Sequence, residues 1–401
     1  MTHSSGNPAA HAPDMPILCV IGDGQLARMM HTEAIELGQS IRVLASSHDS
    51  SAAQVVADVI IGDYTNLDDL RRVVAGSNAV TFDHEHVPSE HLRTLIAEGY
   101  NVQPQPDALL NAQDKLVMRT RLKEMGAPVP PFAPITSVED ARAFWESVDG
   151  QVCVKACRGG YDGHGVWFPD SVTELEELVD KLLSNGTPLM GEKKVQLVRE
   201  LSAMVARTPS GEAQSWPVVE SVQTDGICTE AVAPAPGLSE ALENQCRELS
   251  IRIATELGVT GVLAVELFET RGEDGQPEIF VNELAMRPHN TGHWTQDGCV
   301  TSQFEQHIRA VLDYPLGATD LTAPVTVMAN ILGAATDPAQ PMAERVAEVM
   351  RRFPNAKVHL YGKTYRAGRK IGHINLTGTD VEATRADARL AAQYLVHATW
   401  D

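Results

Sequence analysis

Short apolar runs alternate with amphipathic stretches along the first hundred residues. The runs with the length of buried strands are residues 16–21, 41–44, 59–61 and 79–82. Residues 28–38 have the periodicity of an amphipathic helix that ends at Gly38, and a glycine-containing turn joins them to the first strand. This is the pattern of a βαβ unit, so we predict an N-terminal doubly wound α/β domain, Rossmann-like, over residues 16–110.

The hydrophobic pattern changes after residue 110. A helix is predicted over residues 111–125, and the prolines that follow Gly126 indicate a linker. Further strands are predicted over residues 151–155, 166–168, 261–268, 278–285, 325–332, 358–361 and 371–376, with a long helix over 238–258. Because the pattern changes again after Pro315, we expect a second domain over residues 111–313 and a third over 314–401.

Composition and charge narrow the classes of partner. The 32 Lys and Arg against 53 Asp and Glu give a net charge of −21, which argues against nucleic acid or an anionic membrane as the main partner. Residues 1–15 lack the apolar segment of a secretory signal, so we expect a disordered leader. The six cysteines have no zinc-site spacing, and we expect reduced core thiols in a cytoplasmic protein.

The turn Gly22-Asp23-Gly24-Gln25-Leu26-Ala27 has the GxGxxA spacing of a dinucleotide-binding fingerprint. That fingerprint also needs an acidic residue at the end of the second strand, to bind the ribose. Here the strand ends in Ala45-Ser46-Ser47, and Asp49 comes only beyond it. We therefore favour a tight strand-to-helix turn without NAD or NADP.

Lys155 lies on a predicted strand that leads into a glycine-rich loop. The glycines are Gly159, Gly160, Gly163 and Gly165. Glycines let backbone N–H groups approach phosphate oxygens, and a lysine beside them can neutralise phosphate charge. The spacing is not that of a P-loop. A phosphate site is the functional interpretation, and a hairpin with an exposed lysine is the alternative.

Glu266 and Glu283 each lie within an apolar strand-like run. The turn-forming residues 271–277 separate the two runs, so we predict an antiparallel hairpin. Two buried carboxylates need a cation, and together with Asn282 they offer the oxygen ligands that Mg²⁺ prefers when it bridges nucleotide phosphates. The alternative is that both carboxylates point to solvent.

Two further polar segments are candidates for substrate binding. Residues 287–294, Arg-Pro-His-Asn-Thr-Gly-His-Trp, follow Glu283 closely and include His289, which is either a catalytic or a structural histidine. Residues 361–370 carry four cations in an acidic protein. They form either a phosphate site or a solvated basic hairpin.

Several of these segments together resemble the ATP-grasp superfamily and, within it, the ATP-dependent 5-(carboxyamino)imidazole ribonucleotide synthases of purine biosynthesis. The segments that carry the resemblance are residues 22–26, 159–163, 282–285, 289–295 and 368–373. The resemblance covers residues 16–380. It implies an ATP-grasp fold with a Rossmann-like N-terminal domain and a small C-terminal domain, and a homodimer.

The resemblance also implies a reaction. Aminoimidazole ribonucleotide, bicarbonate and ATP, with Mg²⁺ or Mn²⁺, would give the carboxyamino product, ADP and phosphate through carboxyphosphate. Another ATP-grasp ligase, such as a formate-dependent glycinamide ribonucleotide transformylase or a biotin carboxylase, is the alternative enzyme. A nucleotide-binding regulator without turnover is the alternative from another class.

The resemblance assigns roles to individual residues. The expected nucleotide contacts are Lys115, Lys155, the lid Gly160, Tyr161, Gly163, His164 and Gly165, the hinge Glu192, the ribose-binding Glu200, and Asn282 and Glu283. Glu266 and Glu283 would hold the metal. The expected catalytic residues are Asp162, Arg287 and His289, with Asp162 or His289 taking the amine proton. The expected substrate contacts are Glu85, His86, Tyr161, Asp162, Arg287, His289, Lys363 and Arg369.

The sequence departs from the family pattern at a few of these positions. His164 stands where the family often has arginine, and Lys115 where some members have arginine. The loop from Lys363 to Arg369 is one residue shorter than in some relatives, so Lys370 could take the role of Arg369.

Overall fold

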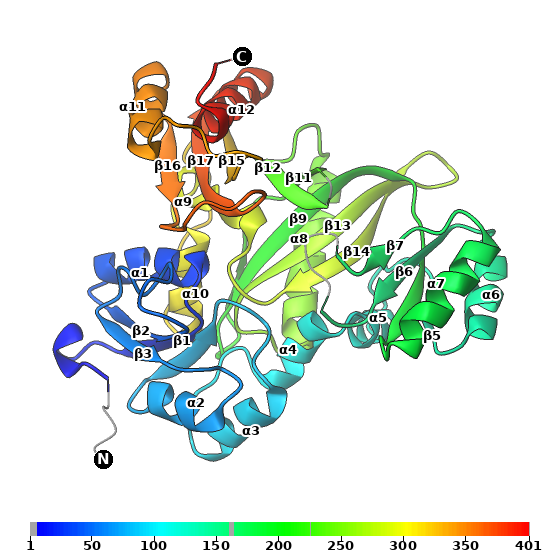
Figure 1. Cartoon of the computed structure of the whole chain (residues 1–401), viewed down its shortest axis with the longest axis horizontal. Helices are drawn as coiled ribbons and strands as arrows, with labels where there is room; N and C mark the ends of the chain where they lie inside the picture. The colour runs from blue at the N-terminus through cyan, green and yellow to red at the C-terminus, as the bar shows by residue number, and fades with distance from the viewer. Residues whose placement is uncertain (1–5, 160–163, 225, 401) are drawn as a thin grey trace.

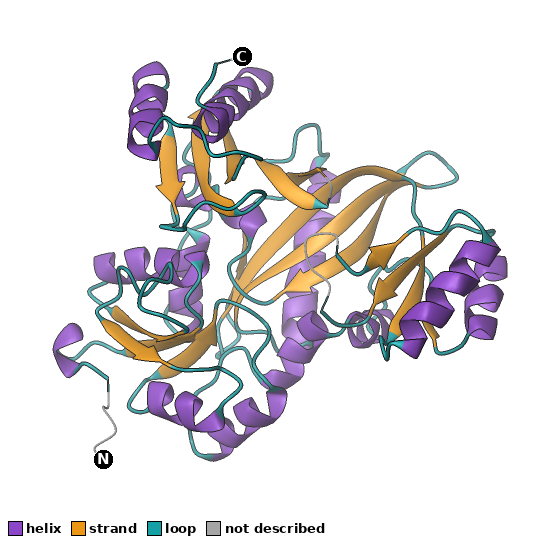
Figure 2. Cartoon of the chain, viewed as in Figure 1, coloured by secondary structure: helices purple, strands orange, loops and turns teal. Residues whose placement is uncertain are grey.

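A computed structural model describes residues 6–159, 164–224 and 226–400. The chain forms an N-terminal α/β part, a small four-stranded sheet and a long central sheet that extends into the C-terminal part (Figures 1 and 2). None of the helices in the described ranges is long and apolar enough to cross a membrane.

The N-terminal part is built on a parallel sheet of order β3-β2-β1-β4. Its elements are β1 (Ile17–Ile21), α1 (Gln25–Glu36), β2 (Ser40–Ala45), β3 (Asp58–Ile61), α2 (Leu67–Val74), β4 (Ala79–Phe82) and α3 (Ser89–Ala97). The predicted strands and the doubly wound fold are confirmed. One covering helix, α10 (Gln303–Val311), comes from much later in the chain, and its Phe304 and Ile308 join the core under α1.

The helix predicted over residues 111–125 is wrong as a single element. The chain forms α4 (Pro106–Gln113) and α5 (Lys115–Glu124), and the break lies at Asp114, whose backbone is extended. The Asp114 carboxylate accepts hydrogen bonds from the N–H groups of Leu116 and Val117, both at 3.1 Å. It therefore caps α5, and the helical periodicity continues through a residue that starts a new helix.

The small sheet has the order β5-β8-β6-β7 and is covered by two helices (Figure 1, right). Its elements are β5 (Phe132–Ile135), α6 (Val138–Ser147), β6 (Val152–Ala156), β7 (Val166–Trp167), α7 (Val172–Ser184) and β8 (Leu189–Lys193). The strand β6 carries Lys155, and its antiparallel neighbour β8 carries Glu192. Residues 160–163 of the expected lid lie outside the described residues.

The central sheet runs in the order β14-β13-β9-β11-β12-β15-β17-β16, and β10 pairs with β9. Its first strands are β9 (Leu197–Arg207), β10 (Ala213–Ser215), β11 (Val219–Thr224), β12 (Ile227–Ala233), β13 (Gly261–Arg271) and β14 (Pro277–Ala285). The helix α8 (Glu240–Glu256) packs against β9 and β13. The polar segment after β14 forms η2 (Asn290–Gly292) and α9 (Thr295–Gly298).

The C-terminal strands continue this sheet rather than forming one of their own. They are β15 (Val325–Leu332), β16 (Lys357–Leu360) and β17 (Lys370–Gly378), with α11 (Met342–Arg352) and α12 (Val381–His397) packed on them. The strand β15 pairs with β12. Arg385 and Arg389 on α12 both pair with the buried Glu230 of β12, each at 2.7 Å, so backbone and charge fix the two parts together.

Part of the expected leader is held against the N-terminal sheet. The short η1 (Pro8–Ala10) is followed by His11, whose Nε2 lies 2.7 Å from Asp58 Oδ2. The N–H of Asn7 donates to Asp58 Oδ1 at 2.7 Å. Residues 6–15 thus differ from the expected disorder because a buried aspartate binds them, and residues 1–5 lie outside the described residues.

Candidate active site

A cleft of about 1210 Å³ lies where the small sheet, the central sheet and the N-terminal part meet. Among the predicted site residues, those that line it are Glu85, His86, Lys115, Lys155, Glu192, Glu200, Glu266, Asn282, Glu283, Arg287, His289 and Lys370. His164, Gly165, Lys363 and Arg369 do not line it. Gly160, Tyr161, Asp162 and Gly163 lie outside the described residues. The cleft thus brings together residues that are far apart in the chain.

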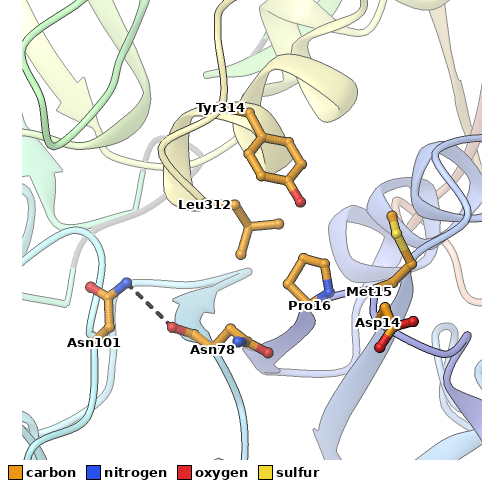
Figure 3. A pocket seen from close by; sticks show the side chains of 7 residues that line it. All are labelled: Asp14, Met15, Pro16, Asn78, Asn101, Leu312 and Tyr314. Carbon is orange, nitrogen blue, oxygen red and sulfur yellow. Dashed lines mark hydrogen bonds between the residues drawn. The ribbon is translucent and has the colours of Figure 1, made fainter.

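A second, smaller pocket of about 460 Å³ lies elsewhere, between the start of the chain, the N-terminal sheet and the loop after α10 (Figure 3). Its lining is Asp14, Met15, Pro16, Asn78, Asn101, Leu312 and Tyr314. This lining includes one carboxylate and no cation, and none of the predicted site residues. The large cleft is therefore the candidate active site.

The two glutamates lie directly opposite each other on β13 and β14, which form the predicted antiparallel hairpin. Side chains at paired positions point to the same face, and both line the cleft. Asn282 Nδ2 lies 3.5 Å from Glu266 Oε2, and Lys115 Nζ donates to Glu283 Oε1 at 2.9 Å. Burial, together with the charges of Glu283 and Glu200, raises the pKa of Glu266. The pair therefore favours binding of a cation.

Lys155 is held inside the cleft by a buried ion-pair cluster. Its Nζ donates to Glu192 Oε1 at 2.5 Å and lies 3.5 Å from Asn282 Oδ1. Burial alone would raise the pKa of Glu192, but the charges of Arg119 and Lys155 outweigh it, and the pKa lies below its usual value. Glu192 is therefore an ionised carboxylate with a cation on each oxygen.

The second cation on Glu192 is Arg119, a residue that the sequence interpretation missed. Its Nε donates to Glu192 Oε2 at 2.5 Å, and its Nη2 donates to the backbone oxygen of Asn282 at 2.8 Å. A helical spacing signal was present, because Arg119 follows Lys115 by one turn and so shares its face of α5. The partner on β8 could not be identified from spacing, since it is 73 residues away.

Glu200 lies on β9, opposite Phe268 of β13, and lines the cleft together with Lys155. Burial raises its pKa to about 7, and the charge of Lys155 opposes that rise. A carboxyl with such a pKa gains free energy by accepting hydrogen bonds from hydroxyl groups. The position thus fits a contact with a polar, uncharged part of a ligand.

His289 is fixed on several sides. Its Nε2 lies 3.2 Å from Glu266 Oε1, and its Nδ1 lies 2.8 Å from Thr291 Oγ1. The buried Gln303 accepts from the His289 N–H at 2.7 Å and donates to its carbonyl oxygen at 2.8 Å. Burial, Arg287 and Lys370 lower the pKa of His289 to about 3, so the imidazole is neutral. Thr291 and Gln303 were not expected from the sequence.

The N-terminal part contributes an acidic edge to the cleft. Arg287 Nε lies 2.8 Å from Glu85 Oε1. The neighbouring Asp83 accepts a hydrogen bond from the Gly24 N–H at 2.5 Å, and burial raises its pKa to about 7. A Cβ at Gly22, where φ is +130°, would collide with this carboxyl, which explains the glycine turn. Asp83 thus accepts a hydrogen bond from the backbone just before the start of α1.

The basic segment near the C-terminus is divided by the fold. Lys370 lines the cleft, whereas Lys363 Nζ donates to Gln25 Oε1 at 2.5 Å, at the first residue of α1. Arg369 Nη1 donates to the Thr364 carbonyl and hydroxyl at 3.2 and 3.1 Å. Burial and the charge of Arg369 lower the pKa of Lys363 to about 8. Lys363 and Arg369 thus contact neutral oxygens.

Three family models match the chain. The ribonucleotide synthetase preATP-grasp domain matches residues 15–113, the ATP-grasp domain residues 120–304, and the phosphoribosylaminoimidazole carboxylase C-terminal domain residues 326–387. The ATP-grasp match includes the small sheet, the hairpin of Glu266 and Glu283, and the second half of α5. The cleft therefore lies within and beside the ATP-grasp domain.

Relatives match almost the whole chain. The N5-carboxyaminoimidazole ribonucleotide synthase of Corynebacterium ammoniagenes is 65% identical over 98% of this chain and 95% of its own length. That of Mycobacterium tuberculosis is 53% identical over 99% of this chain and 92% of its own.

Solved structures agree. The synthetase from Thermus thermophilus is 35% identical with a TM-score of 0.84, over 95% of this chain and 99% of its own. The Aspergillus clavatus enzyme, in complex with ADP and 5-aminoimidazole ribonucleotide, is 29% identical with a TM-score of 0.84, over 95% and 99%. On its cleft, its fold and these relatives, the chain belongs to the N5-carboxyaminoimidazole ribonucleotide synthase family of ATP-grasp ligases.

Proposed function

We propose that the protein carboxylates 5-aminoimidazole ribonucleotide with bicarbonate at the expense of ATP, giving N5-carboxyaminoimidazole ribonucleotide, ADP and phosphate. The observation that carries this proposal is one cleft lined by Lys155, by the paired Glu266 and Glu283, and by Arg287 and His289. The first three suit a nucleoside triphosphate, and the last two suit a second substrate beside it. Family membership supports both substrates.

The nucleotide half of the cleft would work by positioning and charge neutralisation, which dominate phosphoryl transfer. Lys155 and Lys115 would contact the phosphates. Both oxygens of the Glu192 carboxylate already bind cations, so the hinge would contact adenine through its backbone, and Glu200 would accept from the ribose hydroxyls. Attack of bicarbonate on the γ-phosphate would form carboxyphosphate and ADP. His164 and Gly165, with residues 160–163, would close over the phosphates and exclude water.

The hairpin fits a magnesium ion that is shared with phosphates. A raised Glu266 pKa means that this carboxyl gains most when a cation is next to it. Among the described residues, no group of three or more His, Cys, Asp and Glu side chains is placed to hold a metal ion by itself. Phosphate oxygens would therefore complete the coordination of an ion bound by Glu266 and Glu283. Bound there, Mg²⁺ would neutralise the charge on the transferring phosphoryl group, and Mn²⁺ could replace it.

The acceptor half would bind aminoimidazole ribonucleotide. Arg287 and Glu85 would contact the imidazole with His86 and Tyr161, and Lys370 or Arg369, with Lys363, would bind its phosphate. On one route the exocyclic amine attacks the carboxyl carbon of carboxyphosphate, so the N–C bond forms as the C–O bond to phosphate breaks. On the other route carboxyphosphate first breaks down to phosphate and CO₂, and the amine then adds to the CO₂ carbon. Neutral His289 or Asp162 would accept the amine proton.

The test is a coupled assay of ADP release with each acceptor. ADP release that needs aminoimidazole ribonucleotide and bicarbonate together is the expected result. Release with glycinamide ribonucleotide and formate instead would replace our proposal with the transformylase activity. Binding of ATP without turnover of either acceptor would favour a regulatory protein.

We further propose a cytoplasmic homodimer, as the family resemblance implies. The expected mass in solution is that of two 43.4 kDa chains, and light scattering coupled to size exclusion measures it. A single-chain mass at micromolar concentration would contradict the dimer.

A further inference from the structure

Arg119 joins the two sheets that enclose the nucleotide half of the cleft. From α5 its guanidinium donates to the Glu192 carboxylate on β8 of the small sheet and to the Asn282 carbonyl on β14 of the central sheet. The side chain is 1% exposed, and it is not part of the cleft lining. It therefore acts on the cleft through its neighbours.

We infer that Arg119 is a positioning residue that keeps the Lys155 ammonium available to nucleotide phosphates. The inference deepens the proposed function and rests on it, since Lys155 contacts phosphate only if the cleft binds a nucleotide. Its physical basis is charge balance within a buried cluster of three side chains, Arg119, Glu192 and Lys155.

The cluster holds two cations and one carboxylate, so it carries one net positive charge inside the protein. Without Arg119, Glu192 and Lys155 would form a closed pair of zero net charge at 2.5 Å. A closed, buried pair attracts a phosphate much less than a cluster that still has an uncompensated cation. Arg119 shares the carboxylate, and the excess charge remains beside the phosphate site.

The residue type at position 119 also points to function rather than to stability. One guanidinium nitrogen, Nη1, is buried without a hydrogen-bond partner in the described ranges. An unsatisfied buried donor and a net buried charge both destabilise the fold. A planar fork that binds two acceptors on different sheets is what arginine adds over lysine here.

The experiment compares the binding of ADP and of adenosine to the full-length protein by calorimetry at fixed Mg²⁺. ADP has the phosphates and adenosine lacks them, so the comparison isolates the phosphate contacts. For Arg119→Gln we expect ADP to bind about tenfold or more weakly, and adenosine to change by less than about twofold. Arg119→Lys keeps the charge but makes one hydrogen bond fewer. Its affinity for ADP should therefore lie between those of the wild type and Arg119→Gln. An equal loss for both ligands, or no loss for ADP, would overturn the inference.

A double variant covers the case in which Arg119→Gln does not fold, which thermal unfolding reports. Arg119→Met combined with Glu192→Gln removes the buried pair and leaves Lys155 as one net positive charge, as in the wild type. We expect it to bind ADP within about fivefold of the wild type. The charge-balance argument would be contradicted if the double variant bound ADP more weakly than each of Arg119→Met and Glu192→Gln that folds. It would also be contradicted by ADP binding more than about fiftyfold weaker than in the wild type.

The matched control is Arg121→Gln, two residues along the same helix. Arg121 is half-exposed and pairs with Glu124 at 3.2 Å, away from the cleft lining. It should leave both affinities unchanged. Because binding is measured without turnover, a wild type that binds ADP but carboxylates nothing would refute the proposed function alone and leave the test of Arg119 intact.

Discussion

Lys115 and Lys155 of the nucleotide half differ from Lys363 and Arg369 of the basic segment in the groups that bind them. In the nucleotide half, Lys115 and Lys155 bind carboxylates, Glu283 and Glu192, at 2.9 and 2.5 Å. Near the acceptor half, Lys363 and Arg369 bind neutral oxygens of Gln25 and Thr364. Carboxylate partners fix a cation in place, whereas neutral partners leave its charge uncompensated.

This difference suggests two strategies for binding phosphate. The nucleotide half is preorganised, because its lysines already have their positions before the triphosphate arrives. Lys363 and Arg369 of the basic segment carry charge that a phosphate monoester would compensate on binding. We therefore expect damage in the nucleotide half to affect catalysis strongly, and damage in the basic segment to affect mainly the affinity for the acceptor.

The largest effect is expected from Glu283→Ala. It removes a carboxylate from the cation site and frees Lys115, so we expect kcat to fall by about 1000-fold or more with the fold intact. The measurement is ADP release at saturating Mg²⁺, together with thermal unfolding. Glu278→Ala on the same strand is exposed and serves as the control. Activity retained at high Mg²⁺ would refute the assignment of Glu283 to the metal.

The second effect tests the acceptor half. Lys363→Met removes one cation from the substrate phosphate, a charge-assisted contact of about 2 kcal/mol, so KM for aminoimidazole ribonucleotide should rise about thirtyfold. KM for ATP should change by less than about twofold, because the nucleotide contacts are untouched. Lys357→Met, an exposed lysine on β16, is the control. A parallel rise in both KM values would remove the distinction between the two halves.

The third prediction uses the pH dependence of the same lysine. Its pKa of about 8 means that the free enzyme loses this cation as the pH rises through 8, while the substrate phosphate stays fully ionised. The ratio kcat/KM for aminoimidazole ribonucleotide should therefore fall by up to about tenfold per pH unit above 8. A pH series on the wild type and on Lys363→Met, in which this decline should vanish, checks the assignment. An unchanged decline in the variant would point to another group.

The sequence predicted the parts of this contrast that depend on local pattern. The hairpin of Glu266 and Glu283 was found because two apolar strands and their turn are adjacent in the chain. Arg119 was missed because its role depends on its contact with Glu192, which is 73 residues away, and on its burial, which helical periodicity does not reveal. The break at Asp114 was missed for a related reason, since a capping aspartate looks like any polar residue within a helical pattern.

Long-range assembly set the other limits of prediction. Helix α10 completes the N-terminal core, although some 220 residues separate Phe304 from β4, and the C-terminal strands extend the central sheet through β12 and β15. Neither contact leaves a periodic signal in the sequence. The division of the basic segment, with Lys370 in the cleft and Lys363 against α1, likewise depends on where β17 begins.

The smallest effect is expected from Lys115→Arg, and it sharpens the contrast within the nucleotide half. Lys115 makes one ion pair, with a single oxygen of Glu283, and it lies at the cleft with 15% of its side chain exposed. Arginine can form the same pair and has room to do so, so KM for ATP should change by less than about threefold.

Lys115→Met, which leaves Glu283 unpaired, is the control and should raise KM for ATP by about tenfold or more. Arg119, by contrast, binds two acceptors on two sheets, and lysine would replace it there only in part. If Lys115→Arg raised KM for ATP as much as Lys115→Met, the site would require the geometry of the ammonium group as well as its charge. Preorganisation of the nucleotide half would then include Lys115, beside the metal site.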